Sequence, residues 1–179
     1  NDLNKTLADL RTANKELQNS YLDTIHRLVL AAEYKDEDTG DHIVRMSRYS
    51  RLIAGKIGLS KKDVENILYA APMHDVGKIH IADSILKKPG QLSAEEWKVM
   101  QTHTIIGEKI LSDRDFYGTA REIARSHHEN WDGTGYPDRL MANEIPLSAR
   151  VVAVADVFDA MSHKRVYKKA MSEEKVRSI

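Results

Sequence analysis

The sequence contains no cysteine among its 179 residues, and it has only two phenylalanines and two tryptophans. The lack of cysteine excludes disulfide bonds and thiolate metal ligands, and it indicates a reducing compartment. The net charge is zero because 27 basic residues balance 27 acidic ones, which argues against a partner that is a nucleic-acid polymer or a membrane surface. No apolar run reaches the roughly 20 residues of a membrane-spanning helix. These absences predict a cytoplasmic protein, although its parent could still be anchored in a membrane.

The length suits one sizeable domain with an appendage. The chain starts at Asn1 and stops inside an apparent helix, SEEKVRSI. We therefore expect it to be a piece of a longer protein.

A heptad pattern fills the first part of the chain. Its positions alternate steps of four and three residues: Leu3, Leu7, Leu10, Asn14, Leu17, Tyr21, Thr24 and Leu28. The residues between them, up to Asn19, are almost all polar, which favours a coiled coil over a helix packed on its own domain. A single asparagine at an a position fixes a parallel two-stranded register. The pattern predicts a linker and homodimerisation helix over residues 1–28, with one domain over residues 29–179.

Helical patterns follow one another from about Tyr21 onward, and no window alternates strictly as a strand would. Capping-box patterns at Ser60 and Ser93 mark helix starts, and glycine and proline mark the breaks. The β-branched segment 151–155 continues into DVFDAM, an apolar run too long for a strand, so we expect a buried helix there. The sequence predicts an all-α fold.

Five of the eight histidines and two aspartates prolong apolar helical stripes that should face the core. They are His42, His74, Asp75, His103, His127, His128 and Asp156. His103, for example, follows Trp97 and Met100 at three-residue steps. A single histidine of this kind is usually a hydrogen-bonded core residue. Seven buried imidazoles and carboxylates are costly unless they are paired or bind metal, and one shared ion cluster would satisfy them all.

The donor set of five imidazoles and two carboxylates suits Fe, Mn, Ni, Co or Zn better than Mg or Ca. Seven ligands are too many for one tetrahedral ion, so we predict at least two transition-metal ions, with Fe or Mn preferred. Because carboxylates bridge ions readily, Asp75 or Asp156 is the expected bridge. His127 and His128 can bind one ion from adjacent positions near a helix end.

Several segments resemble the HD-GYP family, which comprises cyclic di-GMP phosphodiesterases of the HD metal-dependent phosphohydrolase superfamily. HDVGK at 74–78 is similar to the superfamily signature, and HHENWDGTGYP at 127–137 resembles the motif that gives HD-GYP its name. DEDTGDHIVRMS, KPGQLSAEEWKVMQTHTIIGEKIL and IPLSARVVAVADVFDAM resemble further family segments in the expected order. The resemblance runs from about Tyr21 to the C-terminus. It implies an HD-type helical bundle whose last helices are absent after Ile179.

The resemblance implies a bacterial enzyme that hydrolyses cyclic di-GMP to pGpG and/or GMP with metal-activated water. The ligand positions of the family fall on the same seven residues, and Asp75 and Lys78 are the implied catalytic residues. The predicted substrate-binding residues are Lys78, Tyr136, Asp159, Arg165 and Lys168. Asp159 could instead orient a metal ligand or be a surface acid, and Arg165 and Lys168 could belong to a solvated helix end.

Some positions leave alternatives open. Asp38 lies where some members carry a glutamate that binds a third ion, but it could also cap the next helix. Val166 and Ala82 stand where the family usually has proline. The resemblance further implies an upstream sensor or receiver domain and a signalling-protein contact at the glycine loop 133–137. Two other functions remain open: an HD phosphohydrolase acting on another nucleotide, and a catalytically weak signalling module that responds to a cyclic dinucleotide.

Overall fold

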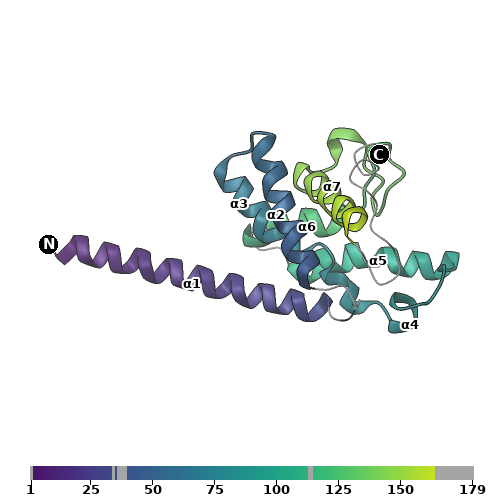
Figure 1. Cartoon of the computed structure of the whole chain (residues 1–179), viewed down its shortest axis with the longest axis horizontal. Helices are drawn as coiled ribbons and strands as arrows, with labels where there is room; N and C mark the ends of the chain where they lie inside the picture. Colours follow the sequence, from purple (N-terminus) through teal and green to yellow (C-terminus); the bar gives the residue numbers. More distant parts are fainter. Residues whose placement is uncertain (1, 34, 36–39, 113–114, 164–179) are drawn as a thin grey trace.

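The computed structural model of the chain describes residues 2–33, 35, 40–112 and 115–163 (Figure 1). These residues contain no β-strand, only an isolated bridge between Asp132 and Met141, so the all-α prediction is confirmed. The α-helices are α1 (Asp2–Glu33), α2 (Gly40–Lys56), α3 (Lys61–Ala70), α4 (Asp83–Leu86), α5 (Ala94–Leu111), α6 (Gly118–Ser126) and α7 (Leu147–Ser162). Four 3₁₀ helices join them: η1 (Ala71–Met73), η2 (Val76–His80), η3 (Asp115–Tyr117) and η4 (Ala142–Glu144). Within the described ranges, no helix is both long and apolar enough to cross a membrane.

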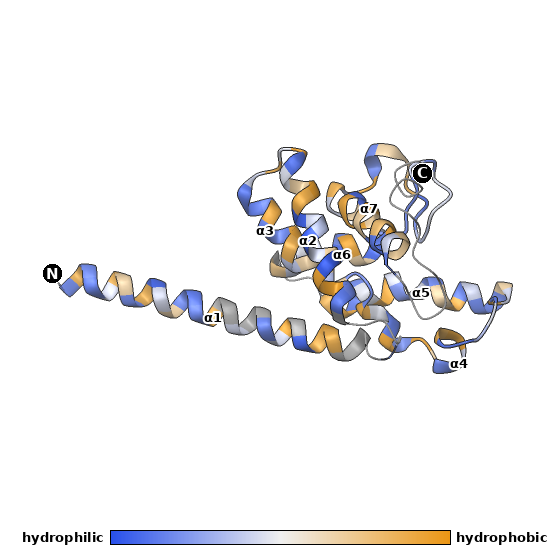
Figure 2. Ribbon diagram, viewed as in Figure 1, coloured by the Kyte–Doolittle hydropathy of each residue, from blue (hydrophilic) through white to orange (hydrophobic). Residues whose placement is uncertain are grey.

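Helix α1 projects far out of the helical body (Figure 1). The leucines at its heptad positions are exposed, with Leu3 at 74% and Leu10 at 65%, and hydrophilic residues surround them along the projecting part (Figure 2). Val29, by contrast, is only 3% exposed and belongs to the core. The helix therefore crosses the predicted boundary at residue 28 without a break. The side chain of Tyr21, a predicted heptad residue, lies outside the described part of the chain, and the coiled coil stays a prediction.

The chain just after α1 is tied to η2. Lys35 Nζ donates to the carbonyl oxygens of Ile79, at 2.7 Å, and Ile81, at 2.6 Å. An ammonium group with these two acceptors fixes the end of η2 to the base of α1.

Helices α2, α3, α6 and α7 enclose the hydrophobic core. Met46 of α2, Ile123 of α6 and Val152 of α7 are fully buried, and each such side chain contributes about 1.5–3 kcal/mol to stability. The segment 151–155 lies inside α7, so the predicted buried helix is confirmed.

The prediction that His74 and Asp75 continue a regular helix is wrong. Helix α3 ends at Ala70, and η1 contains Pro72, which lacks the backbone N–H that a continuing α-helix needs. His74 and Asp75 therefore lie in the tight turn between η1 and η2. Both are buried, as the apolar stripe predicted.

Helix α5 begins with the capping box that the sequence predicted, in which Ser93 and Glu96 satisfy each other's backbone N–H groups. The predicted core-facing stripe before His103 is wrong at its first member, because the Trp97 side chain is 46% exposed. Farther along, α5 packs directly on η2. A Cβ atom on Gly77 would lie 1.9 Å from the carbonyl oxygen of His103, so only glycine permits this approach.

The contact between η2 and α5 generates a stability prediction. Gly77→Ala should lower the free energy of unfolding by about 3 kcal/mol or more, because backbone atoms would have to move to accept the methyl group. Gly55→Ala is the matched control: the site is helical and nothing lies within 4 Å of the added Cβ, so stability should rise by about 0.5–1 kcal/mol. Denaturant unfolding of both variants measures the difference, and a Gly77→Ala protein as stable as the parent would contradict the close packing.

Candidate metal centre

The seven predicted ligands converge in two neighbouring clusters. One cluster contains Asp75, His103, His127 and His128, and the other contains His42, His74 and Asp156. Within each cluster, the candidate ligand atoms all lie within 4.8 Å of one another. The ligands come from α2, the η1–η2 turn, α5, the C-terminal end of α6 and α7. Each cluster can therefore surround one ion, as the predicted two-metal centre requires.

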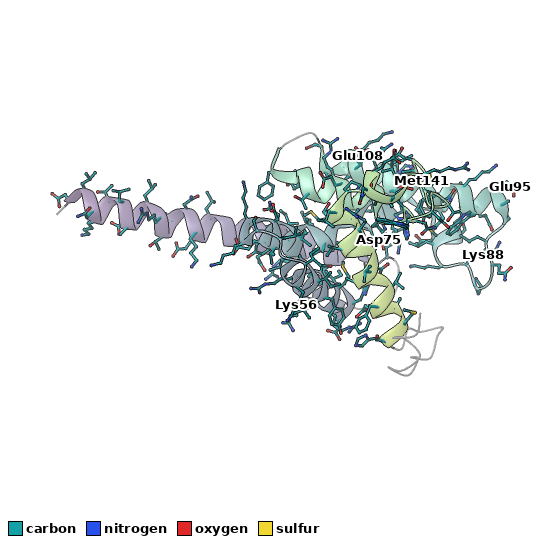
Figure 3. The ribbon with its side chains drawn as sticks, turned by 90° about the horizontal axis from the view of Figure 1, so that it is seen from above. Lys56, Asp75, Lys88, Glu95, Glu108 and Met141 are labelled. Atoms are coloured by element: carbon teal, nitrogen blue, oxygen red, sulfur yellow. The ribbon has the colours of Figure 1, made fainter. Side chains whose placement is uncertain are left out.

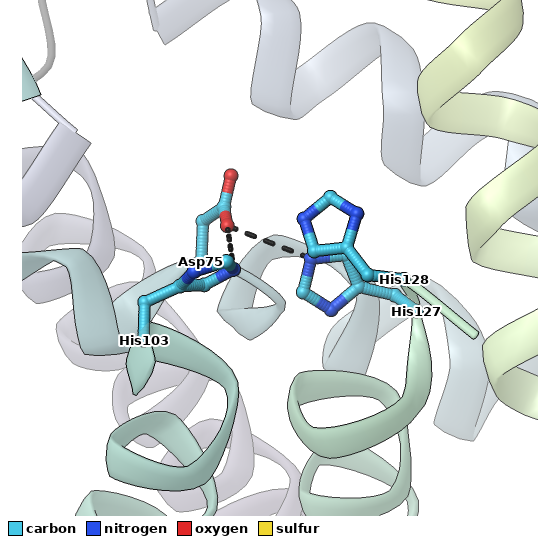
Figure 4. Close-up of side chains that lie close together, drawn as sticks. All are labelled: Asp75, His103, His127 and His128. Atoms are coloured by element: carbon cyan, nitrogen blue, oxygen red, sulfur yellow. Dashed lines mark ion pairs between the residues drawn. The ribbon is translucent and has the colours of Figure 1, made fainter. Parts of the chain in front are cut away.

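Asp75 connects the two clusters. Its Oδ1 lies 3.2 Å from His103 Nε2 and 3.6 Å from His127 Nε2, as the dashed lines in Figure 4 mark. Its Oδ2 lies 3.1 Å from His74 Nε2, in the other cluster. Because each oxygen faces a different cluster, the geometry favours Asp75 over Asp156 as the bridging carboxylate.

Buried atoms of the centre, among them Asp75 Oδ1, His103 Nε2 and His127 Nε2, make no hydrogen bond to any described residue. Leaving such groups unsatisfied costs about 1–3 kcal/mol each, and more when the group is charged. Together they form an oxygen and nitrogen donor set that suits a divalent transition metal. The residues that are present therefore fit the ions that the sequence predicted.

The far side of four imidazoles is held by hydrogen bonds. In three of them Nδ1 faces a backbone carbonyl oxygen. The distance is 3.0 Å from His74 to Ala71, 2.7 Å from His103 to Met100, and 3.0 Å from His127 to Ile123. In the fourth, Nδ1 of His42 lies 2.7 Å from Asp159 Oδ2. These acceptors require Nδ1–H to be the donor, so the lone pair is on Nε2. Such outer partners fix the tautomer and the orientation of a metal-binding histidine.

The cluster around His127 and His128 disfavours protonation. Burial lowers the pKa of His127, and burial together with the neighbouring His127 lowers the pKa of His128 to about 2. Burial raises the pKa of Asp75, but the Lys78 ammonium and His74 outweigh it and keep that pKa well below the usual value. Neutral imidazoles beside an ionised carboxylate are the protonation states that bind metal.

Tyr136 of the glycine loop covers His128. The two rings stack with centroids 4.7 Å apart and an interplanar angle of 24°. Burial, reinforced by the Asp75 carboxylate, raises the pKa of Tyr136. The hydroxyl is therefore protonated at neutral pH and can donate a hydrogen bond next to the centre.

Asp159 is buried, at 1% exposure, so it is not a surface acid. Its carboxylate accepts hydrogen bonds from His42 Nδ1 and, through both oxygens, from the Arg45 guanidinium at 2.7 and 3.0 Å. Burial raises the pKa of Asp159, but the bonds to His42 and Arg45 more than reverse this and lower it. These bonds favour the alternative in which Asp159 orients a candidate metal ligand, His42. A contact of Asp159 with the substrate stays a prediction.

Lys78 lies at the edge of the centre, with Nζ 2.9 Å from Asp75 Oδ2. Ala82, where the family usually has proline, is the N-cap of α4 and has an extended backbone (φ −63°, ψ 140°) that proline would also adopt. Other predicted residues lie outside the described part of the chain: Asp38, Arg165, Val166 and Lys168.

Two functional residues were missed by the sequence analysis. One is Arg45, described above, and the other is Glu129, which is only 6% exposed. The Glu129 carboxylate accepts from the backbone N–H groups of Asp138, at 2.7 Å, and Leu140, at 3.1 Å. It thereby closes the glycine loop that carries Tyr136. The sequence signal for Glu129 was its position directly after the two histidines His127 and His128.

The separation into two clusters predicts a selective metal loss. Asp159→Asn should weaken metal binding by about 10- to 100-fold at the cluster that contains His42, because the imidazole loses its charged acceptor. The cluster of His103, His127 and His128 does not contact Asp159 and should keep its ion. Metal analysis after loading and dialysis should therefore fall from about two ions per chain to about one. The exposed Asp63→Asn is the control, and equal loss from both clusters in Asp159→Asn would contradict the separation.

Residues 17–176 match the HD domain family. Among curated proteins, the chain is 44% identical over 173 residues to 3′3′-cGAMP-specific phosphodiesterase 2 of Vibrio cholerae, which covers 96% of this chain and 32% of that protein. It is 46% identical over 163 residues to the cyclic di-GMP phosphodiesterase response regulator RpfG of Xanthomonas campestris, covering 90% and 43%. It is 43% identical over 180 residues to a cyclic di-GMP phosphodiesterase of Thermotoga maritima, covering 99% and 48%. The chain thus spans a third to a half of these relatives.

A solved structure of a cyclic GMP-AMP-specific phosphodiesterase of V. cholerae, V-cGAP3, shares the fold with a TM-score of 0.60. It is 18% identical and covers 78% of this chain and 40% of that one. The arrangement of the candidate ligands, the family match and the curated relatives agree. The chain belongs to the HD domain family, in its HD-GYP branch.

Proposed function

We propose that the chain is a metal-dependent phosphodiesterase that hydrolyses cyclic di-GMP to pGpG and/or GMP. The observation that carries the proposal is the pair of ligand clusters joined by the two oxygens of Asp75. A dinuclear centre of this kind suits in-line displacement at phosphorus, where charge develops on both the attacking and the leaving oxygen. The names of the curated relatives, which are phosphodiesterases of cyclic dinucleotides, support the substrate class.

The ions would supply Lewis-acid polarisation of the phosphoryl group and acidify water; Fe or Mn is preferred, with Ni, Co or Zn as alternatives. Asp75 and Asp156 would offset the charge of the ions, and the five imidazoles would complete their ligand sets. Asp159 and Arg45 keep His42 in the Nδ1–H tautomer. Asp38 is proposed as a ligand of a third ion.

We infer that two residues of the chain, Lys78 and Tyr136, act on the substrate. Lys78, whose ammonium pairs with Asp75 Oδ2 in the structure, would offset charge on a phosphoryl oxygen. Tyr136 keeps its proton at neutral pH and can donate to the same phosphodiester. Arg165 and Lys168 are proposed as further phosphate contacts from the segment after α7.

A second cyclic dinucleotide is also a candidate substrate. One relative of this chain, at 44% identity, is named for 3′3′-cGAMP, whereas another, at 46%, is named for cyclic di-GMP. Product chromatography on both dinucleotides with metal-loaded protein distinguishes them. A signalling module that binds a dinucleotide without turnover would give binding but no linear product, and an HD phosphohydrolase of another class would give neither.

We also propose that residues 1–28 dimerise as a parallel coiled coil and connect the catalytic domain to an upstream sensor or receiver domain. The exposed leucines of the projecting helix support this, because an isolated helix leaves Leu3, Leu10 and Leu17 in water. The glycine loop 133–137 is proposed as a contact for a signalling protein.

Alanine substitutions at Asp75 and Lys78 should differ in their effects on metal content and turnover. Asp75→Ala should abolish hydrolysis and metal retention together, because both clusters lose their shared carboxylate. Lys78→Ala should retain metal and lower turnover by about 10²- to 10³-fold, the usual effect of deleting one electrostatic contact to a transition state. Metal content, cyclic di-GMP affinity and turnover are measured for both. Full metal loading with near-normal activity in Asp75→Ala would overturn the site, and metal loss in Lys78→Ala would make Lys78 part of the ligand support.

Sedimentation of the protein at roughly tens of micromolar should show a dimer, because pairing buries the exposed heptad leucines. Deleting residues 1–19 should weaken it, because most of the heptad leucines are removed. Asn14→Leu should raise the thermal stability of the dimer while permitting other oligomeric states, since an asparagine at an a position selects the two-stranded register. A monomer with the segment intact would refute the coiled coil.

A further inference from the structure

An exposed indole lies next to the metal centre. Trp97 is on the first turns of α5 and is 46% exposed, although the sequence pattern assigned it to the core. Its ring meets Tyr136 edge to face, with centroids 5.8 Å apart at 80°. Tyr136 in turn stacks on the ligand His128 and lies 6.3 Å from the ring of His103. An aromatic series therefore leads from the metal ligands to the surface at Trp97.

The distance from the centre to Trp97 suits a nucleoside. Trp97 precedes the ligand His103 by six residues on the same helix, which separates them by roughly 9 Å along its axis. The α5 end beyond Trp97, marked by Glu95 in Figure 3, points away from the helical body. A nucleotide whose phosphate lies at the two clusters can extend along this side of α5 and bring its base beside the indole.

The other tryptophan of the chain provides a contrast. Trp131 is 61% exposed, but the Arg150 guanidinium lies 5.7 Å above its ring. That cation accounts for the position of the Trp131 ring without a ligand. Trp97 is instead braced by Tyr136, which fixes the orientation of the indole while nearly half of the side chain stays exposed.

We propose that Trp97, braced by Tyr136, is the stacking platform for one purine base of the cyclic dinucleotide. This assignment rests on the proposed phosphodiesterase function and adds a substrate-binding residue to it. Stacking on an aromatic face tolerates any base, because every base presents a π surface. The platform therefore contributes affinity for both cyclic di-GMP and 3′3′-cGAMP, and it does not discriminate guanine from adenine.

Steady-state kinetics test the platform. Trp97→Ala should raise KM by about 5- to 150-fold, the range expected from the loss of one stacked base. The factor should be the same for both dinucleotides, and kcat should change far less. Trp97→Phe should recover part of the loss because it restores a smaller aromatic face. Trp131→Ala, the matched control, should leave both constants unchanged. A Trp97→Ala enzyme with unchanged KM, or with a loss confined to kcat, would overturn the platform.

Fluorescence provides a second readout. Substrate binding should change the emission of Trp97 if the indole stacks on a base, and should leave it unchanged if Trp97 is only structural. Trp131→Phe leaves Trp97 as the single tryptophan. Mixing this metal-loaded variant with cyclic di-GMP should quench its emission until the substrate is consumed. Equilibrium dialysis of the same mixture detects binding independently, so that a protein that binds without turnover still gives an answer. Bound dinucleotide with unchanged Trp97 emission overturns the platform alone. Stacking without hydrolysis overturns the phosphodiesterase proposal alone, and the absence of binding overturns both.

Discussion

The buried carboxylate of Asp75 is the group on which the rest of the centre depends. One of its oxygens faces His103 and His127 and the other faces His74, so a single side chain joins ligands from separate parts of the chain. A carboxylate in such surroundings requires cations, and in the structure Lys78 provides one. Gly77, two residues later, permits η2 to lie against the backbone of α5. The close packing that places Asp75 is therefore the same packing that stabilises the fold.

Around this carboxylate, hydrogen bonds fix the ring orientation of the candidate histidine ligands and the position of the glycine loop. Backbone carbonyl groups hold Nδ1 of His74, His103 and His127, so helix geometry itself sets the direction of these rings. His42 uses the Asp159 carboxylate instead. Glu129 holds the glycine loop through two backbone N–H groups and thereby keeps Tyr136 over His128. The loop therefore both contributes to the candidate centre and covers it. On the other side, Lys35, just after α1, is hydrogen-bonded to the carbonyl oxygens of Ile79 and Ile81, which follow Asp75 and Lys78 in the chain.

The sequence allowed the all-α fold and the convergence of seven candidate ligands to be predicted, because burial on a helical stripe leaves a periodic pattern. Interactions between distant or irregular segments leave no such pattern. His42 and Asp159 are 117 residues apart, and the partners of Glu129 are backbone groups whose positions depend on the loop conformation. The stripe argument failed at His74 and Asp75, where a proline ends the α-helical geometry, and at Trp97, where a large apolar side chain stays exposed beside the centre. These failures lie at or beside the site, where chemistry rather than core packing selects the residue.

The central claim is that one carboxylate joins two metal ions, and magnetic coupling between them tests it most directly. Electron paramagnetic resonance of the protein loaded with Mn²⁺ should show an exchange-coupled pair, because a bridging carboxylate transmits the interaction between ions that share it. The coupled signal should appear in proportion to the bound metal and should be absent from Asp75→Ala. The spectrum of isolated, uncoupled Mn²⁺ ions at full loading of the unmodified protein would contradict the account.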